Sequence, residues 1–183
     1  MRGYRMSGPV GSAFSEAWSG QGSELLWQIQ RFHSFIWASG GCYNDFLIHI
    51  IDHCCWMKNA WPVKAQALGG RHYRNSPEGI PYVDQNFDTY SVEYTYPDGT
   101  KLFYFGRNMS GAERGFASYA HGTKGSAIIS TNAHAPGKVR SFHGHNFAKE
   151  DMIWAFPQPE PSPYQLEWDD LVAAIRSDTP YNE

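Results

Sequence analysis

The sequence predicts an α+β domain, in which two helices precede an open, largely antiparallel sheet and one helix follows it. Two observations carry this prediction. Apolar residues recur at helical spacing before residue 60, whereas apolar and polar residues alternate in short runs, separated by turn signals, after it. A length of 183 residues fits a single domain, 1–183, with a sizeable core.

The N-terminal part is expected to be an irregular arm followed by one helix. Residues 1–22 are rich in Gly and Ser. Ser23 is a candidate N-cap for a helix that begins at Glu24. The apolar positions of that helix are Leu25, Ile29, Phe32 and Ile36. Their spacing predicts an amphipathic helix of about 14 residues that ends near Trp37.

Residues 44–57 predict a second helix that is apolar nearly all round, and a helix of this kind is normally buried. Asp45, His49 and Asp52 are the exceptions, and their i, i+4, i+7 spacing places them on one side. Burying two carboxylates and an imidazole costs several kcal/mol unless they are paired or meet a wet cavity. We therefore predict that the three residues line one wall of a functional site. The alternative is that they form a hydrogen-bonded polar layer between the helix and the sheet. Gly40 and Gly41 allow a tight turn just before it.

The second half predicts strands and one terminal helix. The expected strands are residues 63–68, 90–96, 100–107, 116–121, 126–130 and 139–142. Turn signals at 97–99 and 122–125 join two of these pairs. Residues 157–183 are expected to form a proline linker and a terminal helix. Ser162 and Gln165 would make its capping box around Pro163.

Composition excludes several classes of function. Hydrophobic residues make up 42% and aromatic residues 16%, which is typical of a globular chain. The net charge is −3 and no basic patch is interleaved with aromatics, so no nucleic-acid partner is expected. No apolar run approaches the roughly 18–20 residues of a membrane span, so no membrane association is expected. The three cysteines, two of them adjacent, predict reduced thiols and a cytoplasmic location.

An ordered set of motifs resembles the C-terminal domain of the glucose-fructose oxidoreductase / inositol dehydrogenase / rhizopine catabolism (Gfo/Idh/MocA) oxidoreductases. The motifs are GGxxxDxxxHxxD at 40–52, PVKA at 62–65, GGR at 69–71, DxxxVEYxYPDG at 88–99, GTKG at 122–125 and AIRxDxPYNE at 174–183. The motifs follow the family's order, and the resemblance as a whole covers the chain from about residue 23 to 183. A lone Asp-x-x-x-His is weak, but the ordered set is specific.

The resemblance implies an open, mainly antiparallel sheet with helices on one face, like the C-terminal domain of glyceraldehyde-3-phosphate dehydrogenase. In the family an N-terminal Rossmann domain binds NAD or NADP and carries a Glu-Lys-Pro motif with a catalytic lysine. This sequence contains neither the dinucleotide fingerprint nor that motif, so the Rossmann domain is a missing partner. The fragment is expected to hold no cofactor and to be inactive alone. The open sheet face is expected to make a homo-oligomer.

The resemblance also assigns roles to residues. His49 matches the family's catalytic histidine and would act as the general acid/base on a sugar, polyol or related cyclic alcohol. Asp45 would orient the substrate hydroxyl or the histidine, and Asp52 would hold the helix or the histidine in place. The sequence departs from the pattern at Cys42, where a third glycine is usual, which puts the shape of this loop in doubt.

Several alternatives stand beside this reading. The chain could belong to an NAD-dependent glycosidase of the same family, or be a non-catalytic oligomerisation module. A metal site is disfavoured because its candidate ligands come from one helix. These ligands are Asp45, His49, Asp52, His53 and Cys54. Trp18 and Arg71 are candidate substrate-binding residues, with packing and an ion pair as their respective alternatives.

Overall fold

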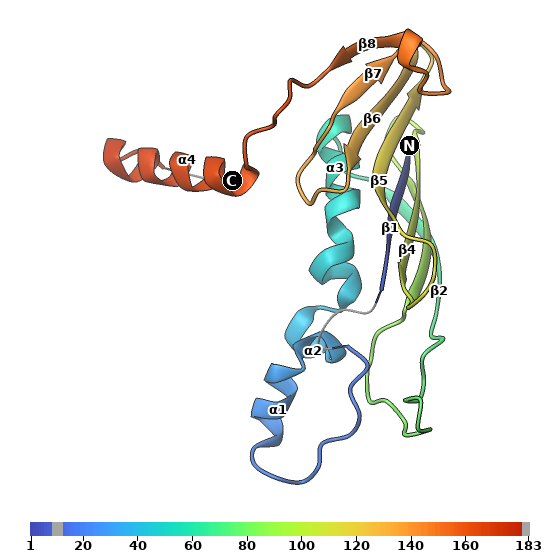
Figure 1. The fold of residues 1–183 in the computed structure, drawn as a ribbon, viewed down its shortest axis with the longest axis vertical. Coiled ribbons are helices and arrows are strands. Elements are labelled where there is room, and N and C mark those ends of the chain that lie inside the picture. Colours follow the sequence, from blue (N-terminus) through green and yellow to red (C-terminus); the bar gives the residue numbers. More distant parts are fainter. Residues whose placement is uncertain (9–12, 181–183) are drawn as a thin grey trace.

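A computed structural model describes residues 1–8 and 13–180 and shows one open sheet with helices on one side (Figure 1). The eight strands lie in the order β2-β3-β4-β1-β5-β6-β7-β8. The strands are β1 (Arg2–Ser7), β2 (Lys64–Gly70), β3 (Thr89–Thr95), β4 (Lys101–Asn108), β5 (Gly115–Gly122), β6 (Gly125–Thr131), β7 (Arg140–Phe142) and β8 (Met152–Ala155). Only β1 and β4 run parallel among these pairs. The predicted α+β class and mainly antiparallel sheet are confirmed.

The expectation of an irregular arm over 1–22 is wrong for Arg2–Ser7, which forms β1 between β4 and β5. Glycine at position 3 serves packing here, because a Cβ atom on Gly3 would overlap the Ile50 side chain. The glycine that suggested an irregular arm therefore allows the helix carrying Ile50 to lie close to the sheet. Residues 13–22 contain no helix or strand, and residues 9–12 lie outside the described residues.

The first predicted helix is divided into α1 (Glu24–Gln30), a 3₁₀ turn (Phe32–Ser34) and α2 (Ile36–Ser39). Ser23 caps α1 as predicted, because its side chain accepts a hydrogen bond from the Leu26 amide at 3.3 Å. The helix breaks because a distant loop competes for its backbone groups. Gln85 donates its amide to the carbonyl of Ser34 at 2.9 Å, and its side-chain oxygen accepts from the Ile36 amide at 2.9 Å.

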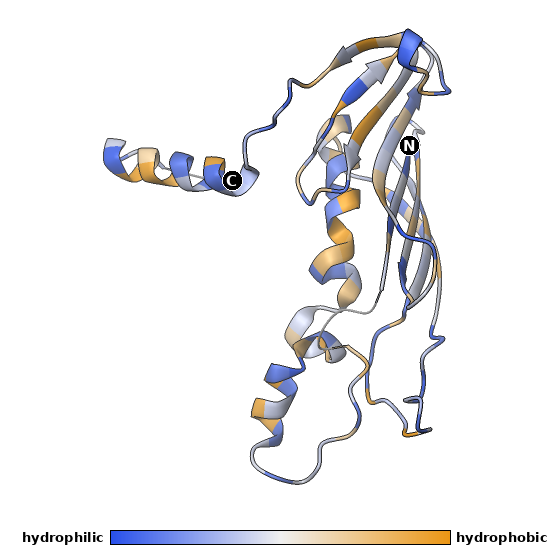
Figure 2. Ribbon diagram, in the orientation of Figure 1, coloured by the Kyte–Doolittle hydropathy of each residue, from blue (hydrophilic) through white to orange (hydrophobic). Residues whose placement is uncertain are grey.

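The second predicted helix begins with a π turn (Tyr43–Leu47) and continues as α3 (Ile48–Lys58). It packs against β1, β5 and β6, and its apolar residues run along the length of the helix in Figure 2. The buried core contains Leu47, Ile50, Ile51, Cys54, Cys55, Val92, Tyr96, Leu102, Tyr104 and Ile129. Asn59, in the left-handed conformation, ends the helix where the sequence predicts.

All six predicted strands are present within a residue or two, whereas β8 was not predicted. The register of β1, β4 and β5 divides their side chains between two faces. Tyr4, Phe105 and Tyr119 lie on the face away from α3, and the Tyr4 and Phe105 rings stack with centroids 5.8 Å apart. We call the residues Tyr4, Phe103, Phe105 and Tyr119 the open-face cluster.

The terminal helix α4 (Pro163–Ser177) stands apart from the sheet and buries none of its residues (Figure 1). Pro163 is its first residue, as predicted, but Ser162 makes no side-chain capping bond, so the predicted capping box is not formed. Trp168 and Ile175 of its apolar face are 63% and 70% exposed. Residues 181–183, the end of the resembling tail, lie outside the described part. No helix of the described part has both the length and the apolarity of a bilayer span.

Candidate functional site

The three polar residues of the second helix lie near one another but have different partners. Asp45 Oδ2 lies 2.8 Å from His33 Nε2, and the His49 ring stacks on the His134 ring with centroids 4.7 Å apart. Asp52 is exposed. Asp45 belongs to the π turn, which winds more residues per turn than an α-helix, so it does not continue the line of His49 and Asp52. In the described residues no hydrogen bond joins Asp45 to His49.

The surroundings of His49 come from three separated parts of the chain. His134 lies in the loop between β6 and β7. A hydrogen bond from His53 Nε2 to the backbone carbonyl of His134, 2.5 Å long, holds this loop against the helix. Arg5 Nη2 of β1 donates to His134 Nε2 over 3.5 Å. The same guanidinium lies 4.1 Å from the centre of the Phe116 ring. Sequence reasoning missed His33, Arg5 and His134, because no spacing relates them to the helix.

The environment keeps His49 neutral. Burial is the largest cause that lowers the pKa of His49 below its ordinary value of about 6.5, and His134 and Arg5 lower it further. The carboxylates of Asp52 and Asp45 act in the opposite direction but do not reverse the shift. A half-buried imidazole that is neutral at pH 7 is ready to accept a proton.

The turn that leads into the helix is built on Asn86. Its Oδ1 accepts from the Cys42 amide at 2.9 Å, and its Nδ2 donates to the carbonyl of His33. Gly41 has φ +87°, and a Cβ atom there would lie 3.0 Å from Asn86 Oδ1, so glycine suits this position. Cys42 itself has a helical φ of −54°. The loop therefore forms without a third glycine, which answers the doubt about its shape.

Trp18 and Arg71 lie in other surroundings. Trp18 donates its indole nitrogen to the carbonyl of Gln21 at 3.0 Å. Arg71 donates to the backbone carbonyls of Tyr73, Tyr82 and Asp84, so it braces its own loop. The ion pair considered as its alternative role is not formed among the described residues. Neither side chain contacts His49 through a hydrogen bond, ion pair or ring contact in the described part. Their substrate roles stay predictions.

The described residues hold no group of three or more His, Cys, Asp or Glu side chains placed for a metal ion. His53 and Cys54 are buried in the core, away from the exposed Asp52. All three cysteines are buried free thiols. Burial raises the pKa of Cys42 and of Cys54 to about 12, so both are protonated at neutral pH.

Comparisons with known proteins establish the fold. A scan against protein-family models and a search of curated protein sequences each found no match. Solved structures similar to this chain include oxidoreductases of the Gfo/Idh/MocA type. The chain has the fold of their C-terminal domain, with its open, mainly antiparallel sheet, as the resemblance implied.

Three solved structures illustrate this likeness. A levoglucosan dehydrogenase in complex with NADH and levoglucosan aligns with a TM-score of 0.63 and 14% identity, over 99% of this chain and 50% of that one. Aldose-aldose oxidoreductase from Caulobacter crescentus aligns with a TM-score of 0.61 and 15% identity, over 97% of this chain and 45% of that one. UDP-N-acetylglucosamine 3-dehydrogenase from Acidithiobacillus ferrooxidans aligns with a TM-score of 0.57 and 13% identity, over 98% of this chain and 45% of that one. The chain thus spans about half the length of the structures it matches.

Proposed function

We propose that this chain is the substrate-side domain of an NAD(P)-dependent oxidoreductase that acts on a sugar, polyol or related cyclic alcohol. The observation that carries the proposal is His49, a half-buried imidazole of lowered pKa on an otherwise buried helix. The solved structures with this fold support the substrate class, because their names include levoglucosan, an aldose and UDP-N-acetylglucosamine.

In this proposal His49 takes the hydroxyl proton of the substrate as the general base, and returns it as the general acid in the reverse direction. A bound nicotinamide supplies the hydride acceptor for the carbinol carbon. The described residues contain no glycine-rich strand–turn–helix for a dinucleotide, so the cofactor would be held by residues outside this sequence. Asp45, paired with His33, orients the substrate hydroxyl, and Asp52 favours the protonated form of His49 after the transfer.

The first test is the DNA sequence upstream of Met1. We expect a continuous frame that encodes a strand, a glycine-rich turn and a Glu-Lys-Pro motif. The protein from that longer frame is expected to reduce NAD⁺ or NADP⁺ with a panel of sugars and polyols, measured by the absorbance of the reduced nicotinamide. The 183-residue chain alone is the control and is expected to be inactive.

The outcomes separate the alternatives. Cleavage of a glycoside without net reduced cofactor would identify the NAD-dependent glycosidase. No turnover with any alcohol or glycoside, in a protein that binds the cofactor, would contradict the catalytic proposal and leave the oligomerisation module.

The open-face cluster supports a proposed homo-oligomer. Phe103 and Phe105 are 46% and 40% exposed on neighbouring positions of one face. We expect Phe103→Glu with Phe105→Glu to convert the wild-type oligomer to a monomer, because two carboxylates would be buried without partners. Light scattering after size exclusion measures this, with Phe156→Glu as the control. A monomeric wild-type chain at the same concentration would overturn the proposal.

A further inference from the structure

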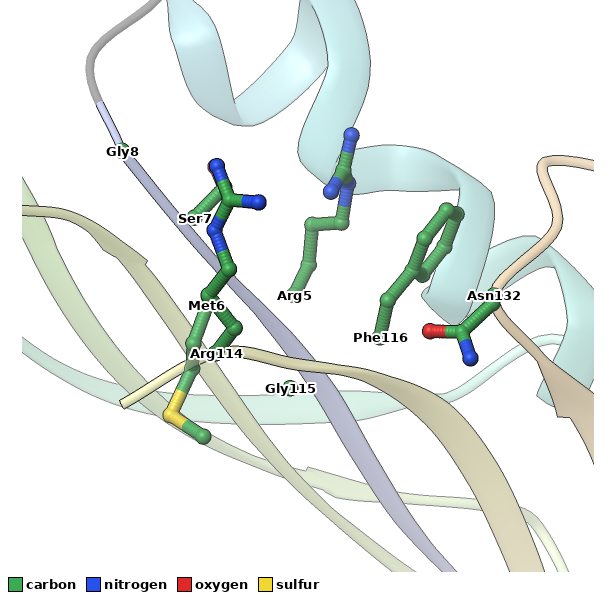
Figure 3. A pocket seen from close by; sticks show the side chains of 8 residues that line it. All are labelled: Arg5, Met6, Ser7, Gly8, Arg114, Gly115, Phe116 and Asn132. Atoms are coloured by element: carbon green, nitrogen blue, oxygen red, sulfur yellow. The ribbon is translucent and has the colours of Figure 1, made fainter. Parts of the chain in front are cut away.

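A cavity of about 410 Å³ opens beside the His49 site between β1 and the start of β5 (Figure 3). This is within the size range of small-ligand pockets. Its lining consists of Arg5, Met6, Ser7, Gly8, Arg114, Gly115, Phe116 and Asn132. In Figure 3 the guanidinium groups of Arg5, on β1, and of Arg114, just before β5, extend in the same direction. None of the eight lining residues is acidic.

Two cations thus share a cavity without a balancing anion. The ion pairs among the described residues are His33–Asp45, Lys58–Asp98 and Lys101–Glu93, and none of them includes either arginine. The positive charge of Arg114 and, above all, burial lower the pKa of Arg5 from its ordinary value. The two like charges repel each other, and an anion bound between them would offset this repulsion.

The rest of the pocket suits an oxyanion. The Phe46 and Phe116 rings hold the Arg5 guanidinium at 5.7 Å and 4.1 Å from their centres, which fixes its direction. Arg5 Nε is buried and has no hydrogen-bond partner among the described residues. Asn132 adds a carboxamide that can donate a hydrogen bond. Planar guanidinium groups bind carboxylate and phosphoryl oxygens with two parallel hydrogen bonds.

We propose that Arg5, Arg114 and Asn132 form a subsite for an oxyanion carried by the substrate. The substrate is then an anionic sugar or polyol derivative, with a carboxylate or a phosphoryl group. This inference rests on the proposed function, because it places that group beside the reacting hydroxyl at His49. Arg5 contacts Nε2 of His134, and His49 stacks on the same ring, so the anion site and the reacting hydroxyl are close enough to be bridged by one molecule of sugar size.

Binding by the 183-residue chain tests the subsite without any cofactor. Isothermal titration with D-glucuronate, D-glucose 6-phosphate and D-glucose compares the two anion sources with the neutral sugar. We expect at least one anionic sugar to bind more tightly than glucose. Arg114→Gln should weaken that binding about tenfold or more, because it removes a charged hydrogen-bond donor. Arg74→Gln, on an exposed arginine outside this cavity, is the matched control.

Arg5→Gln should have a similar effect, but its guanidinium packs on two rings and the variant could lose its fold. The exposed Arg114 keeps the test decisive in that case. Equal affinity for glucose and both anionic sugars, or no change in Arg114→Gln, would overturn the subsite. Reduction of cofactor by neutral polyols alone in the longer protein would also overturn it but keep the proposed function. Anion binding at this subsite without hydride transfer in the longer protein would keep the subsite and overturn the proposed function.

Discussion

Replacement of His49 by glutamine is expected to lower kcat of the cofactor-bearing protein by about 10²–10⁴-fold, the usual contribution of a general acid/base. Glutamine keeps a polar side chain in the space between α3 and His134 but cannot take up a proton at neutral pH. The oligomer and the affinity for the cofactor should stay unchanged, because neither depends on this imidazole in the proposal. Steady-state kinetics with the best substrate measures the loss.

The pH profile gives this prediction a second readout. For alcohol oxidation His49 must be neutral, so the rate should fall as the pH decreases through its pKa. That pKa is below about 6.5 because of burial, His134 and Arg5, so the rate should be on its plateau at pH 7. His145→Gln, a change at an exposed histidine that stacks on His121, is the control. If His49→Gln kept the kcat of the wild type, His49 would not be the general acid/base, whatever the stability of the variant.

The fold was largely predictable where local pattern and tertiary packing agree. The alternation of Tyr90, Val92 and Tyr94 predicts β3, and the run of apolar residues predicts the buried α3. The pattern failed where long-range contacts decide. Arg2–Ser7 forms a central strand because its neighbours β4 and β5, about a hundred residues away, supply both ladders. Its glycine content reflects the close approach of Ile50 and not an irregular arm.

The candidate site shows the same division. His49 and Asp45 could be selected from the sequence because polar residues aligned on an apolar helix are costly to bury. Their partners could not, since His33, His134 and Arg5 arrive from a broken helix, a loop and the missed strand. The π turn also shifts Asp45 out of the line that a straight helix predicts. Sequence periodicity therefore identifies the residues that the helix contributes to the site. The burial that lowers the pKa of His49, and the His134 and Arg5 groups that lower it further, come from tertiary structure.

The second large effect is expected on stability. Leu47 is fully buried where the π turn meets α3, and its side chain lies against β4 next to Gly106, where a Cβ atom would come within 3.1 Å of Leu47 Cδ1. We expect Leu47→Ala to lower the free energy of unfolding by about 2–5 kcal/mol, because it removes buried methyl groups and leaves a cavity in a closely packed part of the core. Urea denaturation of the 183-residue chain, followed by circular dichroism, measures the change.

Leu68→Ala is the matched control, because the same atoms are removed from a side chain that is 80% exposed on β2. Its effect should stay within about 0.5 kcal/mol. The contrast tests the central packing of the fold, in which the helix that carries His49 is fixed to the sheet through its first turn. Equal destabilisation by the two substitutions would mean that Leu47 is not buried against β4. The position of His49 relative to His134 and Arg5 would then lose its structural basis.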